Sequence, residues 1–214
     1  MISDQRAQFL LSVEKLGYRR ANAWLFRALS FQVRTGECVW LRGPNGAGKT
    51  SLLRLLVGLA HADEGRVVNA NPNSLNSTAP VYVGHTNALK EDLTAMESLQ
   101  FLLQLDDHAV DKMAALEAMR QFSIHQRCHQ IVKTLSQGQR RRVALSRLAL
   151  KKESALWVLD EPFEALDYQG MEVLYRLISE HTQRGGSVLL TSHIPVESSA
   201  FPLRALDFCK LGLA

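Results

Sequence analysis

Cysteines are few and scattered in this chain. The three present, Cys38, Cys128 and Cys209, form no C-x-x-C pair and no closely spaced framework. Secreted domains held together by disulfides carry more cysteines in far fewer residues. We therefore expect reduced thiols, as in a cytoplasmic protein.

Long apolar runs are also missing. No run of 18 apolar residues occurs, and the most apolar stretch, Leu52–Ala60, is interrupted by Arg54. A membrane-spanning helix needs about 20 such residues. The first residues hold Asp4 and Arg6 and no apolar segment typical of a secretory signal. We expect a cytoplasmic chain that reaches a membrane only through a partner.

The excess of positive charge is mild. The net charge is +4 and no basic–aromatic repeat accompanies it, whereas nucleic-acid-binding domains cluster basic residues on one face. We predict no nucleic-acid partner and a surface that is solvated or faces acidic lipid. With 46% hydrophobic residues among 214, the chain can bury one sizeable core.

A phosphate-binding loop pattern, G-x-x-x-x-G-K-[ST], is present. We expect it to bind the phosphates of a nucleotide through Gly43, Pro44, Asn45, Gly46, Ala47, Gly48, Lys49, Thr50 and Ser51. Its glycines allow backbone N–H groups to point at a phosphate, and the helix predicted over Lys49–Ala60 directs its positive end there. Lys49 can reach the β- and γ-phosphates, and the Thr50 hydroxyl can bind Mg²⁺.

The hydrophobic periodicity predicts strands, then helices, then alternating strands and helices. Predicted strands cover Phe9–Val13, Leu25–Val33, Glu37–Leu41, Arg66–Asn69, Val81–Gly84, Ser154–Leu159, Ser187–Thr191 and Ala205–Lys210. Polar segments predict a turn at Arg19–Asn22 and a surface loop at Asn71–Thr78.

The segment between about Leu93 and Leu150 is predicted to be helical. Thr94 and Glu97 form a capping box at the start of the first helix. A second helix, Asp111–Phe122, carries Met113, Leu116 and Met119 on one stripe. Further helices are predicted over Gln137–Leu150 and Gln169–Gln183.

An apolar strand ends in two acids, Asp160 and Glu161. In open α/β sheets, ligands bind at the carboxyl ends of the strands. Asp160 suits Mg²⁺, and Glu161 suits a general base that polarises the attacking water. Alone, such a strand end is usually a solvated turn.

A further helix start occurs at Leu135-Ser136-Gln137-Gly138-Gln139. Ser136 suits an N-cap, and Gly138 permits close approach of the backbone. The segment is either a second phosphate-binding helix terminus or an ordinary capped helix.

Together these motifs resemble the ATP-binding cassette family. GPNGAGKTS, LSQGQ and LDEP, followed by Ala165-Leu166-Asp167 and Thr191-Ser192-His193, match its motifs in order and spacing. The resemblance implies an α/β fold: a phosphate-loop NTPase (RecA-like) core with an antiparallel β subdomain and an inserted helical subdomain. It implies one cassette over residues 1–214, with the core at 1–84 and 151–214 and the helical subdomain at about 86–150.

The resemblance also implies a mechanism that uses ATP and Mg²⁺. Two copies pair head to tail, so that Ser136, Gly138 and Gln139 of one copy contact the nucleotide bound by the other. Asp167 bridges the two sites. Catalysis then rests on Glu161, His193 and Lys49, with Thr50 and Asp160 on the metal.

Two positions depart from the family pattern or match it loosely. An aromatic residue near the second strand is expected to stack on adenine, and Tyr18 is our candidate, with Trp24 as the alternative. His85 stands where the family has a glutamine. An imidazole still forms hydrogen bonds, but its protonation depends on pH near neutrality. The usual role of this position in linking hydrolysis to a membrane subunit is then differently tuned.

One possible metal-binding cluster and one basic run are better explained as ordinary parts of helices. His125, Cys128 and His129 would share one face of a helix, as metal ligands do, but no fourth ligand is evident and a polar helix end is favoured. The run Arg140–Arg142 is interpreted as the exposed side of the helix that follows LSQGQ.

The short length, Phe163 after the LDEP proline and His85 resemble the ATP-binding subunits of bacterial cytochrome c maturation (haem exporter) complexes. This implies a peripheral protein on the cytoplasmic face of the inner membrane, partnered by integral permease subunits (CcmB/CcmC-like). The alternatives are an ATPase of another short bacterial exporter, a soluble cassette protein acting on ribosomes or DNA, and a small kinase. LSQGQ and His193 argue against the kinase.

Overall fold

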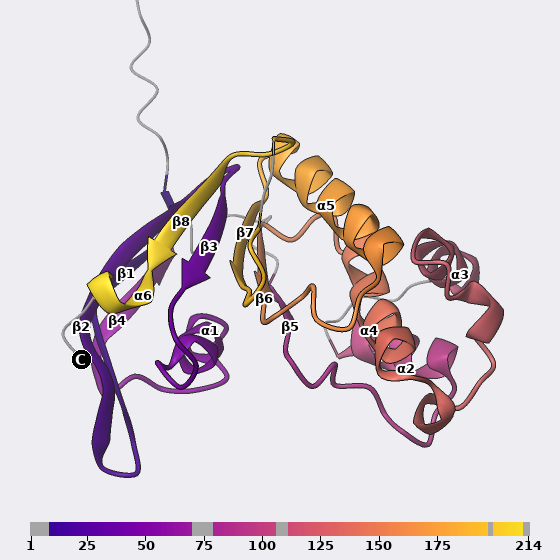
Figure 1. Ribbon diagram of the computed structural model, residues 1–214, viewed down its shortest axis with the longest axis horizontal. Coiled ribbons are helices and arrows are strands. Elements are labelled where there is room, and N and C mark those ends of the chain that lie inside the picture. The colour runs from indigo at the N-terminus through magenta and orange to yellow at the C-terminus, as the bar shows by residue number, and fades with distance from the viewer. Residues whose placement is uncertain (1–8, 70–78, 106–110, 197–198, 212–214) are drawn as a thin grey trace, which may run out of the picture.

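The computed structural model describes residues 9–69, 79–105, 111–196 and 199–211 (Figure 1). The strands are β1 (Phe9–Arg20), β2 (Ala23–Arg34), β3 (Cys38–Arg42), β4 (Glu64–Asn69), β5 (Val81–Val83), β6 (Leu156–Leu159), β7 (Ser187–Thr191) and β8 (Leu203–Asp207). The α-helices are α1 (Lys49–Leu56), α2 (Ala95–Gln104), α3 (Lys112–Gln121), α4 (Gln137–Ser146), α5 (Tyr168–Gln183) and α6 (Phe208–Leu211). Short 3₁₀ turns lie at His125–Arg127, Val132–Thr134 and Arg147–Ala149.

A five-stranded parallel sheet in the order β5-β6-β7-β3-β8 forms the centre of the molecule. In its register, Leu41 lies opposite Thr191 and Leu159 lies opposite Leu190. Because the strands are parallel, their carboxyl ends meet at one edge. The loop after β3, the acids after β6 and the end of β7 therefore come together.

Alternate side chains of the central strands enter two different cores. In β6, Trp157 and Leu159 pack into a cluster shared with α5 and the helices α2–α4, and Leu156 and Val158 into a cluster shared with α1 and the β1–β2 hairpin. Figure 1 shows α1 and α5 on opposite sides of this sheet. Burial of β6 on both faces explains why its sequence is a continuous apolar run.

A second, antiparallel sheet has the order β2-β1-β4. The predicted strands at Phe9–Val13 and Leu25–Val33 are present but too short, since pairing continues to Arg20 opposite Ala23. The turn is only the two residues Ala21 and Asn22, both with positive φ (49° and 63°), as a tight hairpin requires.

The helices α2, α3 and α4 lie together at one end of the molecule (Figure 1). The capping box of Thr94 and Glu97 is confirmed. The apolar stripe predicted for α3 is wrong at Met113, whose relative exposure is 64%. Steps of three residues drift around a helix of 3.6 residues per turn, and the buried face of α3 runs instead through Ala115, Ala118 and Met119.

Several predicted ends differ from the structure. The helix after Gly48 stops at Leu56, and the helix predicted to Leu150 changes to a 3₁₀ turn at Arg147. The strand predicted to Lys210 stops at Asp207 because α6 begins there, where Phe208 is buried edge-on against Phe26 with ring centroids 5.5 Å apart. The loop predicted at 71–78 lies outside the described residues.

Within the described part of the chain, none of the helices is both long enough and apolar enough to cross a membrane.

Candidate nucleotide site at the carboxyl edge of the parallel sheet

The phosphate-loop sequence forms the turn between β3 and α1, as predicted. Gly46 and Gly48 adopt φ of 80° and 104°, which a side chain disfavours. A Cβ on Gly48 would also lie 2.8 Å from Leu25 Cγ. Lys49 is buried, and its Nζ donates hydrogen bonds to the carbonyl oxygens of Gly43 (2.7 Å) and Pro44 (2.9 Å). The ammonium group is thus held against the loop.

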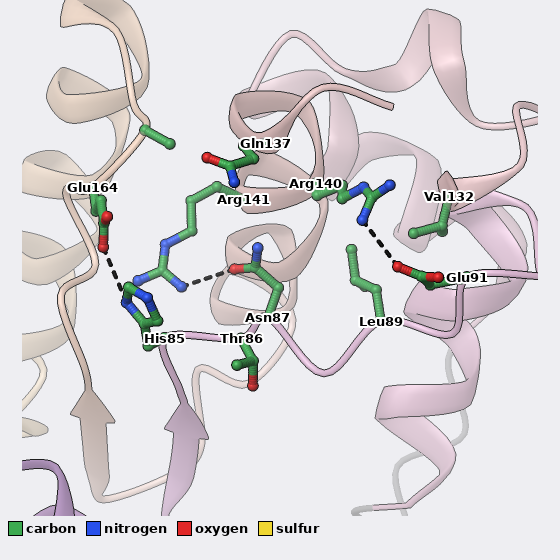
Figure 2. Close-up of a pocket in the computed structure, with 11 residues that line it drawn as sticks. His85, Thr86, Asn87, Leu89, Glu91, Val132, Gln137, Arg140, Arg141 and Glu164 are labelled. Carbon is green, nitrogen blue, oxygen red and sulfur yellow. Dashed lines mark hydrogen bonds and ion pairs between the residues drawn. The ribbon is translucent and has the colours of Figure 1, made fainter. Parts of the chain in front are cut away.

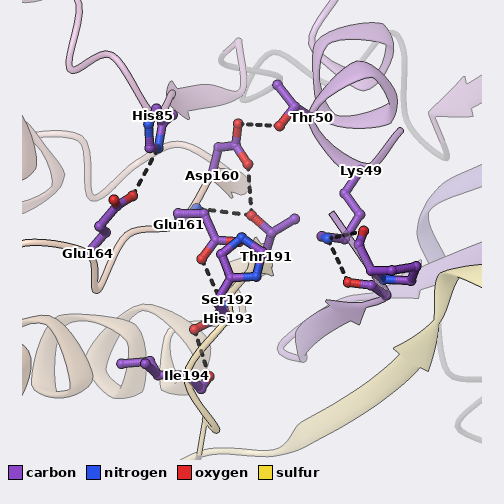
Figure 3. Close-up of polar contacts among 12 residues, drawn as sticks. Lys49, Thr50, His85, Asp160, Glu161, Glu164, Thr191, Ser192, His193 and Ile194 are labelled. Atoms are coloured by element: carbon purple, nitrogen blue, oxygen red, sulfur yellow. Dashed lines mark hydrogen bonds and ion pairs between the residues drawn. The ribbon is translucent and has the colours of Figure 1, made fainter. Parts of the chain in front are cut away.

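Asp160 connects the phosphate loop to β7 (Figure 3). Its carboxylate is 2% exposed and accepts hydrogen bonds from Thr50 Oγ1 and Thr191 Oγ1, both at 2.8 Å. A hydroxyl and a carboxylate are the oxygen donors that Mg²⁺ prefers. The residues predicted for the metal, Thr50 and Asp160, are therefore adjacent and chemically suited to it.

Glu161 lies next to His193. Its Oε2 accepts a hydrogen bond from the His193 backbone N–H (2.8 Å), and its Oε1 lies 3.4 Å from His193 Nε2. The backbone of Glu161 has φ of 50°, a left-handed conformation that costs energy in a residue with a side chain. The Thr191 hydroxyl accepts from the Glu161 N–H at 3.0 Å.

These groups line one open cleft of about 670 Å³, within the size range of small-ligand sites. Its wall includes Lys49, Thr50, Asp160, Glu161 and His193. A lysine, a carboxylate pair and a glycine-rich helix start on one wall suit the phosphate end of a nucleotide with its metal.

Neither aromatic candidate for the adenine is among the described residues that line this cleft. Tyr18 packs on Phe26 with ring centroids 6.1 Å apart, and the Arg19 guanidinium lies 4.1 Å from the ring centre of Trp24. Arg20 and Leu25 line the cleft instead. The adenine role of Tyr18 stays a prediction that this geometry does not favour.

The signature residues lie apart from the phosphate loop. Ser136 and Gln139 form a capping box at the start of α4, so Ser136 is the N-cap that the sequence predicted. A Cβ on Gly138 would lie 2.7 Å from the Ala165 carbonyl oxygen. Asp167 caps α5 and pairs with Arg142. None of these four residues is among the described residues that line the cleft with Lys49.

His85 follows β5 and reaches the same edge of the sheet. Its Nδ1 lies 3.0 Å from Glu164 Oε2. Both side chains line the nucleotide cleft and also a smaller cavity of about 300 Å³ beside α4 (Figure 2). His85 therefore connects the end of β5 with the segment that follows Glu161.

The interpretation of Arg140–Arg142 as an exposed side is wrong. Arg141 is 3% exposed, because this side of α4 packs against the segments that follow β5 and β6. Sequence reasoning missed it because arginine is rarely buried. Sequence reasoning also assigned no role to Thr191, although a hydroxyl at the end of a predicted strand, directly before Ser192-His193, is a signal that could have found it.

The alternative metal cluster at His125, Cys128 and His129 gains no support. His125 begins a 3₁₀ turn, Cys128 is buried and His129 is exposed. In the ranges that the structure describes, no group of three or more His, Cys, Asp or Glu side chains could hold a metal ion.

Comparison with known proteins agrees with the motifs. A family model described as ABC transporter matches residues 26–164. A relative from Albidiferax ferrireducens, named cytochrome c biogenesis ATP-binding export protein CcmA, is 42% identical over 202 residues, covering 92% of this chain and 96% of the relative. A relative of the same name from Vibrio cholerae is 40% identical, covering 86% and 91%.

Solved structures share the fold. An ATP-binding subunit of an ABC transporter superposes with a TM-score of 0.77 at 24% identity, covering 93% of this chain and 86% of that one. A dimeric ATP-binding cassette in a post-hydrolysis state, bound to ADP and Pi, superposes with a TM-score of 0.77 at 21% identity, covering 92% and 94%. The chain therefore belongs to the ABC transporter family, as an ATP-binding cassette related to the cytochrome c biogenesis ATP-binding export proteins.

Proposed function

We propose that this chain is the ATP-hydrolysing subunit of an export complex in cytochrome c biogenesis. The observation that carries ATP hydrolysis is the hydrogen-bonded series Thr50–Asp160–Thr191–Glu161–His193 beside the phosphate loop, and the export role rests on the names of the relatives. Such a series gives one edge of the sheet a metal-binding pair, a base and a group that orients the base.

The phosphates of ATP bind to the loop Gly43–Ser51 in this proposal. Lys49 exchanges its two carbonyl partners for phosphate oxygens, which are stronger acceptors. Thr50 and Asp160 would hold Mg²⁺, which would neutralise charge on the phosphates. Burial strengthens these interactions, since the carboxylate of Asp160 is shielded from water.

Glu161 acts as the general base toward the attacking water. Its Oε2 is held by the His193 backbone N–H, and its Oε1, 3.4 Å from His193 Nε2, is the oxygen that would accept the proton. His193 Nε2 lies 3.4 Å from Glu161 Oε1, so an imidazole that contacted the γ-phosphate would also stay beside the base. This supports His193 as the residue that connects ATP to the base.

A second copy completes the site in this proposal. Ser136, Gly138, Gln139 and Asp167 are not among the described residues lining their own chain's cleft. We infer that the three signature residues contact nucleotide bound by a partner copy and that Asp167 bridges the two sites. One solved neighbour of the same fold is a dimer of cassettes. A head-to-tail homodimer gives the signature residues a ligand.

The membrane partner in this proposal is an integral permease, and the chain is peripheral on the cytoplasmic face of the bacterial inner membrane. The names of the relatives describe export in cytochrome c biogenesis. We propose that the segment of about 86–150 forms a helical subdomain beside the core at 1–84 and 151–214, with His85 at the junction between them. Co-purification with a detergent-solubilised permease tests this assignment.

The catalytic assignment is tested by Glu161→Gln. The amide keeps the shape of the side chain and one acceptor oxygen but cannot accept the proton. We expect ATP binding to be retained and hydrolysis to fall by roughly 10²–10⁴-fold, the range for loss of a general base. Phosphate release and nucleotide binding measure the two effects. Hydrolysis at the wild-type rate would remove Glu161 from this role.

A further inference from the structure

Arg141 is a buried charge outside the motifs that assign the site. It lies in α4, five residues after Ser136, and its relative exposure is 3%. Burying a guanidinium destabilises the fold unless its donors are paired. The hydrogen-bond acceptors of the Arg141 guanidinium therefore indicate the role of this residue.

Three consecutive backbone carbonyls accept hydrogen bonds from Arg141. Nη2 donates to the oxygens of Asp160 (2.9 Å) and Glu161 (2.7 Å), and Nε donates to that of Pro162 (3.3 Å). The guanidinium thus binds the main chain of the segment that presents both acids of the site.

The remaining nitrogen binds the loop that follows β5. Nη1 donates to the Gly84 carbonyl oxygen (2.9 Å) and to Asn87 Oδ1 (2.8 Å), and Figure 2 shows Arg141 reaching across the cavity wall to Asn87. One side chain of α4 therefore joins two segments from the carboxyl edge of the sheet.

Arg141 keeps its charge in this place. Burial lowers the pKa of the guanidinium to about 10, against the acids Glu164, Asp160 and Glu161, which raise it. At neutral pH it is still cationic, and charge-assisted hydrogen bonds are stronger than neutral ones. The hydrogen bonds from the charged Arg141 to the backbone carbonyls are therefore of the stronger, charge-assisted kind.

The segment Asp160–Pro162, which Arg141 binds, includes a residue with a strained backbone, Glu161. Glu161 has φ of 50°, and its two peptide groups are each fixed, the N–H by Thr191 Oγ1 and the carbonyl by Arg141 Nη2. Strained backbone persists only where its surroundings hold it. The direction of the Glu161 carboxylate depends on that backbone.

We propose that Arg141 is a positioning residue for Glu161: by binding the carbonyls of Asp160–Pro162 it fixes the backbone that aims the carboxylate, and it makes that aim depend on α4 and on the loop at 84–87. The proposal rests on the assignment of Glu161 as base. A shift of α4 relative to the sheet then reaches the base through one side chain.

Arg141→Lys is the first test, since it keeps the charge but has one nitrogen for five acceptors. We expect kcat to fall about 10- to 100-fold, the cost of a misplaced catalytic group, while KM and ATP binding stay within about threefold. The matched control is Arg140→Lys in the same helix. Arg140 directs its hydrogen bonds to the Leu135 and Lys133 carbonyls and to Glu91, away from residues 160–162, so its kcat should stay at the wild-type value.

The Glu161→Gln background separates positioning from general damage. If Arg141 acts through Glu161, Arg141→Lys changes the residual rate of Glu161→Gln by less than about twofold, because effects of residues that act as a unit do not add. Asn87→Ala, which removes one acceptor at the rim and leaves the helix intact, should show a smaller loss with the same non-additivity. It replaces Arg141→Lys if that variant does not fold.

A wild-type kcat in Arg141→Lys would overturn the proposal. So would an equal loss in both backgrounds, or a loss seen only in KM. These results differ from failure of the catalytic assignment itself, in which Glu161→Gln alone retains wild-type hydrolysis.

Discussion

Thr191 holds both acids of the site through one hydroxyl. Its Oγ1 donates to Asp160 and accepts from the Glu161 N–H. The side chain is fully buried, so water does not replace a lost hydrogen bond there. An unmade hydrogen bond at a buried polar group costs about 1–3 kcal/mol.

We therefore predict that Thr191→Val lowers the rate of ATP hydrolysis measurably. Valine has the same shape without the hydroxyl, so the Asp160 carboxylate loses one of its two hydroxyl donors. We expect kcat to fall roughly 10-fold or more, measured by steady-state phosphate release. Thr191→Ser retains the hydroxyl and should stay within about threefold of wild type. Equal rates in the valine and serine variants would contradict this role.

At the residue scale, the sequence predicted the acids and the phosphate loop because their chemistry is tied to fixed spacing. Lys49, Asp160 and His193 line one cleft, and their roles in it stay predictions. Arg141 escaped prediction because a basic run on a helix normally faces solvent. Its burial depends on how α4 packs against residues far away in the sequence, which no local pattern records.

Helix α2 depends on its capping box. Thr94 Oγ1 accepts from the Glu97 N–H (3.3 Å), and the Glu97 carboxylate accepts from the Thr94 N–H (2.9 Å). The box satisfies two of the donors that a helix start leaves unpaired. Because Leu99 and Leu103 of α2 are buried in the larger core, fraying at this end exposes apolar side chains.

Thr94→Ala is expected to lower the free energy of unfolding by about 1 kcal/mol, the usual cost of losing a threonine or serine N-cap. Urea denaturation followed by circular dichroism measures this change. Thr94→Ser, which keeps an acceptor oxygen, is the control and should stay near wild type. Equal stability of the alanine and serine variants would show that the cap contributes nothing.

At the element scale, the sequence located the elements better than their ends. The hydrophobic periodicity and the helix-capping residues predicted β6, β7, α2 and α5, because both signals follow from local residue chemistry. The 3₁₀ turn after α4 and the start of α6 at Phe208 were missed. Their positions depend on packing, as with Phe208 against Phe26.

The stability of the whole molecule is linked to pH through His181. The ring is 1% exposed and stacks on Trp157 with centroids 3.9 Å apart. Burial, with a smaller contribution from Arg184, lowers its pKa from 6.5 to about 4. Between these values the unfolded chain binds a proton that the folded chain does not. Stability is therefore unaffected above about pH 6.5 and falls as the pH drops toward 4.

His181→Phe keeps an aromatic ring over Trp157 and removes the titration. Relative to this variant, the wild type should lose about 2 kcal/mol of unfolding free energy between pH 7.5 and pH 5. Urea denaturation across this pH range measures the difference. His61→Gln changes an exposed histidine and should follow the wild type. Parallel pH curves for wild type and His181→Phe would contradict the linkage.

At the scale of the whole molecule, the order of motifs predicted the family and the α/β class. The strand order β5-β6-β7-β3-β8 and the two cores on either side of the sheet could not be read from the chain, because they depend on pairing between distant segments.

The central claim is that ATP is enclosed between two copies of this chain, and the mass of Glu161→Gln in solution tests it most directly. Light scattering during size-exclusion chromatography should give a dimer with ATP and Mg²⁺ and a monomer without nucleotide, because hydrolysis no longer opens the complex. Adding Ser136→Arg should abolish the dimer while ATP binding persists. A saturating ATP complex that stays monomeric, or a dimer that survives Ser136→Arg unchanged, would contradict the account.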